Sequence, residues 1–302
     1  MMMRGDLSLL LLVVVASFGG EALQLGPSSK RTRRETLSEA VISVAAGVML
    51  PSLAARAAGP KTVFVAGATG QTGRRVVERL SKIDGVSVVG GVRDVEKGAK
   101  ALAESSVAVR GAMIQQVAGV TSTEATTLKR LDVVKDDVQQ MASALEGVDA
   151  VVVATGFVPG INPLTMDAAA HAVDNLGTVK LVDAALQAKV PKIVLVSSIL
   201  TNGRNWGQEN SPGFVVTNAF GHVLDEKIQA ENHIRKSGLD YTIVRPGGLK
   251  AKPPAAGLKV AKEDTLSAGE VSRDFVADVC VAALFDSNAS NKVVEIIEDD
   301  DS

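Results

Sequence analysis

Three glycines stand at steps of three residues between an apolar run and a helical pattern. They are Gly67, Gly70 and Gly73 in "TVFVAGATGQTGRRVVERL". The first glycine permits a tight turn, the second lets a pyrophosphate approach the backbone, and the third lets the helix pack closely on the strand. The N–H groups and the positive end of that helix favour bound phosphate. The spacing predicts a dinucleotide site rather than a purely structural turn, with contacts from Gly67, Ala68, Thr69, Gly70, Gln71, Thr72 and Gly73.

The end of the second apolar run distinguishes the two dinucleotides. Arg93 lies there, twenty residues after Gly73, in "GGVRD". An acidic residue at this place would accept hydrogen bonds from a free ribose 2′-hydroxyl and select NAD, whereas an arginine pairs with a 2′-phosphate. Arg93 therefore predicts NADP (NADPH) in preference to NAD, and the alternative is an arginine that only faces solvent. Asp94 is expected to cap the next helix.

Six motifs follow one another along the chain: "VAGATGQTGRRVVERL", "GVRD", "LEGVDAVVVATG", "KIVLVSS", "AENHIRKSGLDYTIVRPGGL" and "SRDFVADVCVAAL". The set resembles the atypical short-chain dehydrogenase/reductases that carry an NAD(P)H-binding domain. Similar proteins include NADP-binding proteins of the plastid import translocon and, more distantly, flavin/biliverdin-reductase-like proteins. The resemblance covers residues 61–298 and implies that Asp132 and Val133 border the adenine. It implies further cofactor contacts at Ala154, Thr155, Gly156, Ser197, Lys227, Pro246, Gly247 and Gly248.

The catalytic pair of ordinary short-chain dehydrogenases is Tyr-x-x-x-Lys, in which the lysine lowers the pKa of the phenol. The single tyrosine here, Tyr241, starts an apolar strand and precedes Arg245 by four residues, so it is interpreted as structural. Lys227 matches the family lysine, but Val223 occupies the tyrosine position. Lys227 is left either to bind ribose hydroxyls or to face solvent.

The candidate catalytic residues are therefore Ser198, His222 and Lys227. Ser198 ends the fifth strand and could hydrogen-bond a substrate carbonyl, or only its own backbone. His222 could donate a proton near neutral pH, or be an exposed helix residue. A loop from Asn202 to Gly213 could close over the substrate, with Trp206 stacking on a ring or only fixing the loop.

Other kinds of chemistry have no pattern in the sequence. The single Cys280 excludes an intrachain disulfide, lies in a helical pattern and is expected in the core. No His/Asp/Glu cluster has metal-ligand spacing, so no metal is expected. The net charge of −2 argues against a nucleic-acid partner.

The function expected is NADPH-dependent reduction of a small carbonyl, quinone or flavin-like acceptor. A flavin-like acceptor needs no strong general acid, which fits the missing tyrosine. The alternative is a non-catalytic NADP-binding sensor, scaffold or assembly factor in a plastid, with a membrane-complex partner. An epimerase-like enzyme fits less well.

Apolar runs alternate with helical patterns from Lys61 onward. This alternation predicts an α/β, Rossmann-type, doubly wound parallel sheet in one domain, with small C-terminal elements on the substrate side. The strands are expected at residues 62–66, 86–92, 127–133, 150–156, 192–198 and 241–246, with "KVVEII" (292–297) as a possible edge strand. Residues 105–126 are expected to form an irregular insertion, and residues 168–189 one helical pattern.

The first 58 residues differ from the rest and are interpreted as a targeting region. Residues 1–19 resemble a secretory signal, and residues 20–58 hold a basic spacer and a second apolar run that ends in an A-x-A triplet. The tandem resembles bipartite targeting to a secondary plastid, with the thylakoid lumen as the possible destination; a secreted or membrane-anchored protein is the alternative. The NAD(P)-binding domain is placed at 59–298 and a solvated acidic tail at 299–302.

Overall fold

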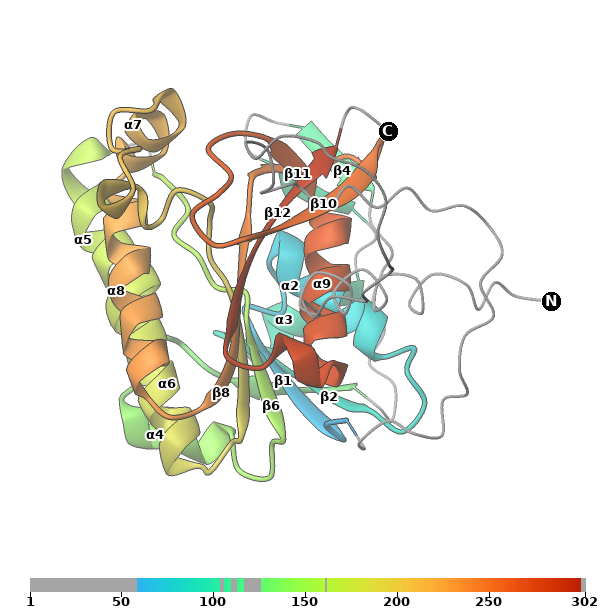
Figure 1. Cartoon of the computed structure of the whole chain (residues 1–302). Helices are drawn as coiled ribbons and strands as arrows, with labels where there is room; N and C mark the ends of the chain where they lie inside the picture. Colours follow the sequence, from blue (N-terminus) through green and yellow to red (C-terminus); the bar gives the residue numbers. More distant parts are fainter. Residues whose placement is uncertain (1–58, 104–105, 110–112, 117–125, 161, 300–302) are drawn as a thin grey trace, which may run out of the picture.

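The computed structural model describes residues 59–103, 106–109, 113–116, 126–160 and 162–299, which form a layered α/β fold (Figure 1). Its central sheet has eight strands in the order β10-β12-β8-β7-β6-β1-β2-β5. Their bounds are β1 Thr62–Ala66, β2 Ser87–Val92, β5 Thr126–Arg130, β6 Ala150–Val153, β7 Lys192–Val196, β8 Asp240–Pro246, β10 Gly257–Lys262 and β12 Lys292–Asp299. Seven of these strands are parallel, and β10 runs antiparallel to β12 at the edge. The predicted doubly wound sheet is confirmed.

The central strands are buried on both faces, which explains their nearly continuous Val, Ile and Ala sequences. All four residues of β6 are buried, as are the last four of β1 and of β7. The chain moves along the sheet in one direction from β1 to β2 and β5, and in the other from β6 to β12. The order reverses between β1 and β6, and open α/β sheets bind ligands outside the carboxyl ends of the strands at such a reversal.

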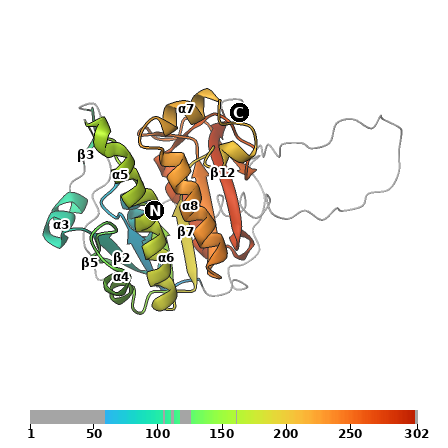
Figure 2. The same cartoon turned by 90° about the vertical axis from the view of Figure 1, so that its left-hand side faces the viewer.

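Helices cover both faces of the sheet, as Figures 1 and 2 show. One face carries α2 (Gln71–Leu80), α3 (Val95–Ala103) and α9 (Arg273–Phe285). The other carries α4 (Val138–Ala144), α5 (Met166–Ala170), α6 (Thr178–Gln187) and α8 (Val223–Lys236). Val76, Val77 and Leu80 of α2 are fully buried against the sheet. These side chains form the apolar stripe by which α2 packs on the sheet.

Short elements gather beyond the carboxyl ends of β7 and β8. They are η4 (Gly203–Asn205), α7 (Pro212–Asn218), and the parallel pair β9 (Gly248–Lys250) and β11 (Glu270–Ser272). A small apolar cluster holds them to the main body; it consists of Ile199, Leu200, Phe214, Leu224 and Leu266. The sequence predicts small elements of this kind at the C-terminal end, but part of them comes from the middle of the chain.

Three sequence predictions about elements are wrong or incomplete. The strand "KVVEII" is not at the edge, because β12 lies between β8 and β10. The stretch 105–126 contains an antiparallel hairpin of β3 (Ser106–Val109) and β4 (Met113–Gln116), so it is not wholly irregular. The single helical pattern at 168–189 is interrupted by a π-helical segment, η3 (His171–Gly177), between α5 and α6. Two short 3₁₀ turns complete the description: η2 (Pro163–Thr165) and η5 (Ser287–Ala289).

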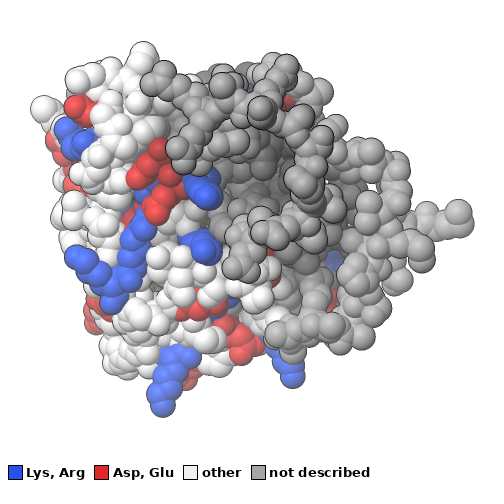
Figure 3. All heavy atoms as spheres, in the orientation of Figure 1, with Lys and Arg blue, Asp and Glu red and all other residues white. Residues whose placement is uncertain are grey.

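The remaining domain-level predictions concern the two ends and the surface. The targeting region 1–58 and residues 300–302 of the tail lie outside the described residues. Within the described part of the chain, no helix is long and apolar enough to span a membrane. Over those same residues, no group of His, Cys, Asp and Glu side chains is arranged to hold a metal ion. Acidic and basic side chains are intermixed on the face that Figure 3 shows.

Candidate functional site

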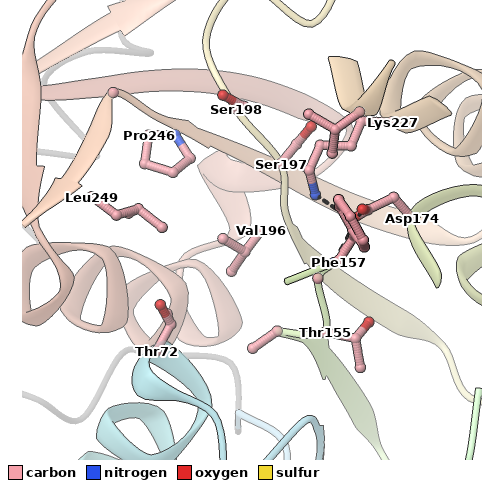
Figure 4. Close-up of a pocket in the computed structure, with 14 residues that line it drawn as sticks. Thr72, Thr155, Phe157, Asp174, Val196, Ser197, Ser198, Lys227, Pro246 and Leu249 are labelled. Carbon is pink, nitrogen blue, oxygen red and sulfur yellow. Dashed lines mark hydrogen bonds and ion pairs between the residues drawn. The ribbon is translucent and has the colours of Figure 1, made fainter. Parts of the chain in front are cut away.

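Three adjoining pockets follow the carboxyl edge of the sheet. The turn-side pocket has a volume of about 460 Å³ and is bordered by the glycine turn and the ends of β2, β5 and β6. The central pocket, about 220 Å³, lies between the ends of β6, β7 and β8 (Figure 4). The outer pocket, about 760 Å³, lies among the short elements beyond β7 and β8. Ala154–Phe157 line both the turn-side and central pockets, and Ser198, Gly247 and Leu249 line both the central and outer ones.

The glycine turn has the geometry that its spacing predicts. Gly67 has a φ of +80°, and a Cβ there would lie 2.8 Å from the carbonyl oxygen of Ala154. A Cβ on Gly73 would lie 2.9 Å from the carbonyl carbon of Gly67 and still closer to its oxygen. Gly70 precedes α2 with no side-chain cap, and the first turn of α2 has no acidic residue. The N–H groups at the start of α2 are therefore available to a phosphate.

Arg93 lies where a second-strand residue can contact the adenosine ribose. Its exposed side chain lines the turn-side pocket together with Asp132 and Val133. No ion pair or hydrogen bond joins it to another described residue, whereas Arg130 at the end of β5 pairs with Asp136 at 2.6 Å. Arg93 thus lines the pocket with a guanidinium that has no partner among the described residues.

Two aspartates near Arg93 have structural roles. Asp94 accepts a hydrogen bond from the Lys97 N–H at 3.0 Å, and this bond lowers the pKa of Asp94. The predicted helix cap is confirmed. Asp132 is buried and accepts hydrogen bonds from the N–H groups of Val134 and Lys135. This turn ends β5 at Arg130, before the predicted end at residue 133.

A buried hydroxyl supports a bound dinucleotide. Thr155, at the end of β6, lies on the wall shared by the turn-side and central pockets. Its Oγ1 is buried without a hydrogen-bond partner among the described residues. Buried polar groups are nearly always hydrogen-bonded in native proteins. The orphaned hydroxyl and the uncapped start of α2 fit a nucleotide laid across this edge. Gly67 and Gly73 allow the turn, α2 and the end of β6 to approach one another closely there.

Lys227 lies in the central pocket, and an aspartate that the sequence analysis missed holds it there. The Lys227 ammonium forms an ion pair of 2.9 Å with Asp174, whose side chain is almost fully buried (Figure 4). Asp174 also accepts a hydrogen bond of 3.1 Å from the N–H of Phe157. Asp174 belongs to the π-helical segment, and single π-helical turns inside α-helices are frequent at functional sites. Lys227 is therefore not a solvent-facing residue, and Val223 lines the same pocket.

The two serines at the end of β7 differ in their surroundings. The Ser197 hydroxyl donates a hydrogen bond of 2.6 Å to Glu231 and is buried. It is therefore committed to the protein interior, and its predicted cofactor contact is limited to the pocket wall. Ser198 is half-buried and lines both the central and outer pockets. Pro246 lines the central pocket, Gly247 both, and Gly248 the outer one.

A buried ionic network supports the serines and the short elements. Arg245 is fully buried and pairs with Glu231 at 2.7 Å, Asp264 at 2.8 Å and Glu295 at 3.4 Å. Burial alone would lower the pKa of Arg245, but the hydrogen bonds and charges of Glu231 and Asp264 raise it above its usual value. Arg245 therefore stays charged and anchors the carboxyl end of β8.

Other candidates lie away from the pockets. His222 has an exposed side chain, precedes α8 with a φ of 52°, and lines none of the three pockets. The structure therefore gives no support to His222 as a proton donor. Trp206 packs on the apolar cluster of the short elements and lines no pocket either, which favours a role in fixing the loop. Tyr241 packs in the core beneath α6 and α8, as a structural residue would.

The two other histidines and the cysteine lie away from the pockets. His171 and His233 contact Glu226 and Asp183 at 2.8 Å and 2.7 Å. Cys280 is fully buried, and burial raises the pKa of its thiol to about 12. The thiol is therefore neutral at physiological pH and is a core residue, as expected.

The comparison with family models identifies the chain's family. Residues 99–287 match the model described as NAD(P)H-binding. The chain belongs to this family. The match begins after the glycine turn and Arg93, so the assignment of those residues rests on their own geometry. The resemblance of the sequence to NAD(P)H-binding proteins is confirmed.

Relatives of this NAD(P)H-binding chain extend the match to 78% of its length. An uncharacterized chloroplastic protein of Arabidopsis thaliana is 46% identical over 237 residues, which are 78% of this chain and 76% of that protein. Protein TIC 62, chloroplastic, of Pisum sativum is 34% identical in an alignment of 248 residues that covers 78% of this chain but only 42% of TIC 62. The sanguinarine reductase of Eschscholzia californica is 28% identical in an alignment of 190 residues that covers 53% of this chain and 68% of the reductase.

Solved structures share the fold. ChuY, an anaerobillin reductase from Escherichia coli O157:H7, superposes with a TM-score of 0.58 at 22% identity. The superposition covers 79% of this chain and 98% of ChuY. At this identity the likeness supports the Rossmann-like fold alone.

Proposed function

We propose that the protein binds NADP(H) and transfers a hydride from it to an organic acceptor held in the outer pocket. The observation that carries the proposal is the placement of Lys227. It lies in the central pocket, between the part of the groove that fits a dinucleotide and the larger outer pocket. A cofactor laid from the turn-side pocket across Thr155 would bring its reactive end to this junction. Reductases are among the relatives of the chain.

The preference for NADP over NAD rests on Arg93. A 2′-phosphate adds two negative charges and several acceptor oxygens at the ribose, and an arginine can bind it through two parallel hydrogen bonds. Arg93 is exposed on the turn-side pocket and has no described carboxylate partner that would compete. The same place in an NAD-selective site would carry an acidic side chain.

The chain supplies binding, orientation and charge to the reaction, while NADPH when bound supplies the hydride. Reduction of the acceptor takes up that hydride and one proton, and leaves NADP⁺. The Lys227 ammonium, fixed by Asp174, stabilises negative charge that develops on the acceptor beside the central pocket. The Ser198 hydroxyl is placed to hydrogen-bond the same acceptor atom. Val223 stands where ordinary members have the tyrosine whose phenol delivers the proton. The proton therefore comes from solvent, or the acceptor is one that needs no proton at the moment of hydride transfer.

This chemistry favours quinone and flavin-like acceptors over simple carbonyls, because their reduced forms carry stabilised negative charge. A non-catalytic NADP-binding sensor or assembly factor remains the second candidate, favoured by the same Val223. Two of the relatives described above are chloroplastic proteins, and we propose a plastid location for this one. The bipartite targeting signal, the lumenal destination and a membrane-complex partner remain predictions from the sequence.

Oxidation of NADPH followed at 340 nm tests the function directly. The purified protein should oxidise NADPH with FMN, a benzoquinone or an aromatic aldehyde, and Lys227→Met should lower kcat about tenfold or more. Lys236→Gln is the matched control, because Lys236 is exposed in the last turn of the same helix and lines no pocket. Tight NADPH binding without turnover of any acceptor would replace the reductase with the sensor.

A further inference from the structure

The outer pocket has one charged side chain in its wall. Arg273, the first residue of α9, lines it, and the other lining residues are apolar, hydroxyl-bearing, glycine or glutamine. Among the residues that the structure describes, no aspartate or glutamate lines the pocket. The largest of the three pockets is therefore a mainly uncharged cavity of about 760 Å³ with a cation at one place.

The guanidinium of Arg273 is fixed in the wall but its charge is not neutralised. One of its nitrogens donates a hydrogen bond of 3.1 Å to the carbonyl oxygen of Leu249, which also lines the pocket. No ion pair joins Arg273 to any described carboxylate. A hydrogen bond to a neutral carbonyl uses one of the five N–H donors and leaves the others for a ligand.

Two neighbouring arginines, unlike Arg273, have carboxylate partners that neutralise their charge. Arg75 and Arg79 of α2 both pair with Asp274 of α9, at 3.3 Å and 3.0 Å, and Arg79 also pairs with Asp278. Asp274 is thus already shared between two cations. Burial, followed by repulsion from Arg75, lowers the pKa of Arg273. An anion beside Arg273 would relieve both the repulsion and the lost hydration.

We infer that the outer pocket takes an acceptor with a bulky, mainly apolar body and an anionic group, a carboxylate or a phosphate, which binds Arg273. The pocket shares Ser198, Gly247 and Leu249 with the central pocket, so an acceptor anchored at Arg273 has its opposite end beside Lys227. That the ligand is a hydride acceptor rests on the proposed function, but the anion site can be tested by binding alone.

FMN and riboflavin are matched probes for this site, because they share the isoalloxazine ring and differ by one phosphate. The full-length protein is saturated with NADP⁺, which prevents turnover and fills the cofactor site, and each flavin is titrated by its fluorescence. FMN should bind about tenfold more tightly than riboflavin, since a charge-assisted hydrogen bond to a phosphate is worth about that much. Arg273→Gln should weaken FMN to the level of riboflavin, and riboflavin itself should be unaffected.

Two variants control for charge and folding. Lys236→Gln removes the same charge from the far end of α8 and should keep the preference for FMN. Arg273→Lys keeps the charge without the planar fork and should restore part of it. Affinity for NADPH, measured on each variant, shows that the cofactor site is intact.

The outcomes separate the anion site from the reductase function. Equal affinity for the two flavins, no binding of either, or a loss of FMN binding shared by Lys236→Gln would each overturn the anion site. A loss of NADPH affinity in Arg273→Gln would assign the arginine to the cofactor and also overturn it. A preference for FMN that depends on Arg273, without oxidation of NADPH, would leave the site standing and remove the reductase.

Discussion

The two ends of the groove are built in different ways. At the turn-side end, backbone N–H groups at the start of α2 are the groups offered to a ligand, and Gly67 and Gly73 allow the close packing of the turn. Among the described residues that line this end, Arg93 is the one charged side chain without a partner. At the outer end, the walls are short elements that side chains hold in place. Arg245 alone joins three segments through Glu231, Asp264 and Glu295.

Glu295 shows how far this dependence goes. Besides Arg245, its carboxylate accepts hydrogen bonds of 2.8–3.1 Å from the backbone N–H groups of Asp264, Thr265 and Leu266. One buried side chain thus fixes the course of a whole loop that leads to the outer pocket. An end built from backbone tolerates little change in shape, but its structure depends little on charged side chains. An end built from side chains can be altered by the substitution of single charged residues.

The largest effect is expected from adding one methyl group to the turn-side end. In Gly73→Ala the new Cβ would overlap the carbonyl of Gly67, so α2 must move away from the turn. NADPH affinity should fall by about 100-fold or more, and the free energy of unfolding by about 1–3 kcal/mol, the usual cost of overpacking. Calorimetric titration and urea unfolding measure the two quantities.

Gly160→Ala is the control for that substitution. Its Cβ would meet nothing within 4 Å and its φ is not positive, so neither quantity should change. If Gly73→Ala bound NADPH like the wild type, the close approach of turn and helix would not be what shapes the cofactor site.

The next effect concerns the single free charge of the same end. Arg93→Gln should weaken NADPH binding about 10- to 100-fold and leave NADH almost unchanged, because only NADPH presents a phosphate there. Arg130→Gln, which removes an equal charge already paired with Asp136, should change neither. Equal affinities of the wild type for NADPH and NADH would refute the assignment to NADP.

The sequence predicts the turn-side end well because its parts are close together in the chain. A strand, a glycine turn and a helix within twenty residues form a local unit whose geometry does not depend on distant segments. The next strand of the chain, β2, lies beside β1 in the sheet, as consecutive strands usually do. Arg93 could be placed from its distance along the chain alone. None of these inferences requires knowing how distant segments meet.

The central pocket and the outer end escape sequence analysis because their side chains meet across long separations. Asp174 and Lys227 are 53 residues apart, and the π-helical segment shifts the phase of the helix so that its periodic pattern does not reveal which face Asp174 occupies. Glu295 appears as a charged residue in an apolar run, which is typical of an exposed edge strand. It lies instead in a buried strand, because Arg245 and three N–H groups compensate its charge.

A smaller effect, on turnover, is expected from the buried carboxylate of the central pocket. Asp174→Asn keeps the shape of the side chain but removes the anion that holds Lys227, so kcat for NADPH oxidation should fall about tenfold. The Kd for NADPH should change less than about threefold, since the turn-side end is untouched. Asp183→Asn makes the same change where the carboxylate contacts His233 on the outside of α6. An equal loss of kcat in both variants would show that Asp174 acts on stability and does not position Lys227.

The smallest effect tests whether acid loosens the outer end selectively. Arg204 of η4 pairs with Asp225 of α8 at 2.7 Å, and the hydrogen bond from Arg204 is the main cause that lowers the pKa of Asp225. A carboxyl whose folded-state pKa lies below its unfolded value of about 3.9 contributes stability above that value and loses it as the pH falls through the folded pKa. Arg204→Gln should therefore lower the free energy of unfolding by about 0.5 kcal/mol at neutral pH, because the pair is largely exposed.

That difference should diminish as the pH falls through the folded-state pKa of Asp225, as urea unfolding at pH 7 and at about pH 2.5 will show. Arg93→Gln is the matched control, because Arg93 has no described carboxylate partner and its effect on stability should not depend on pH. Arg204 also lies 5.1 Å from the centre of the Phe214 ring, a contact that acid leaves intact. A stability loss of the same size at both pH values would therefore assign the contribution of Arg204 to the Phe214 ring and not to Asp225, and would make the outer end less dependent on ion pairs than its geometry indicates.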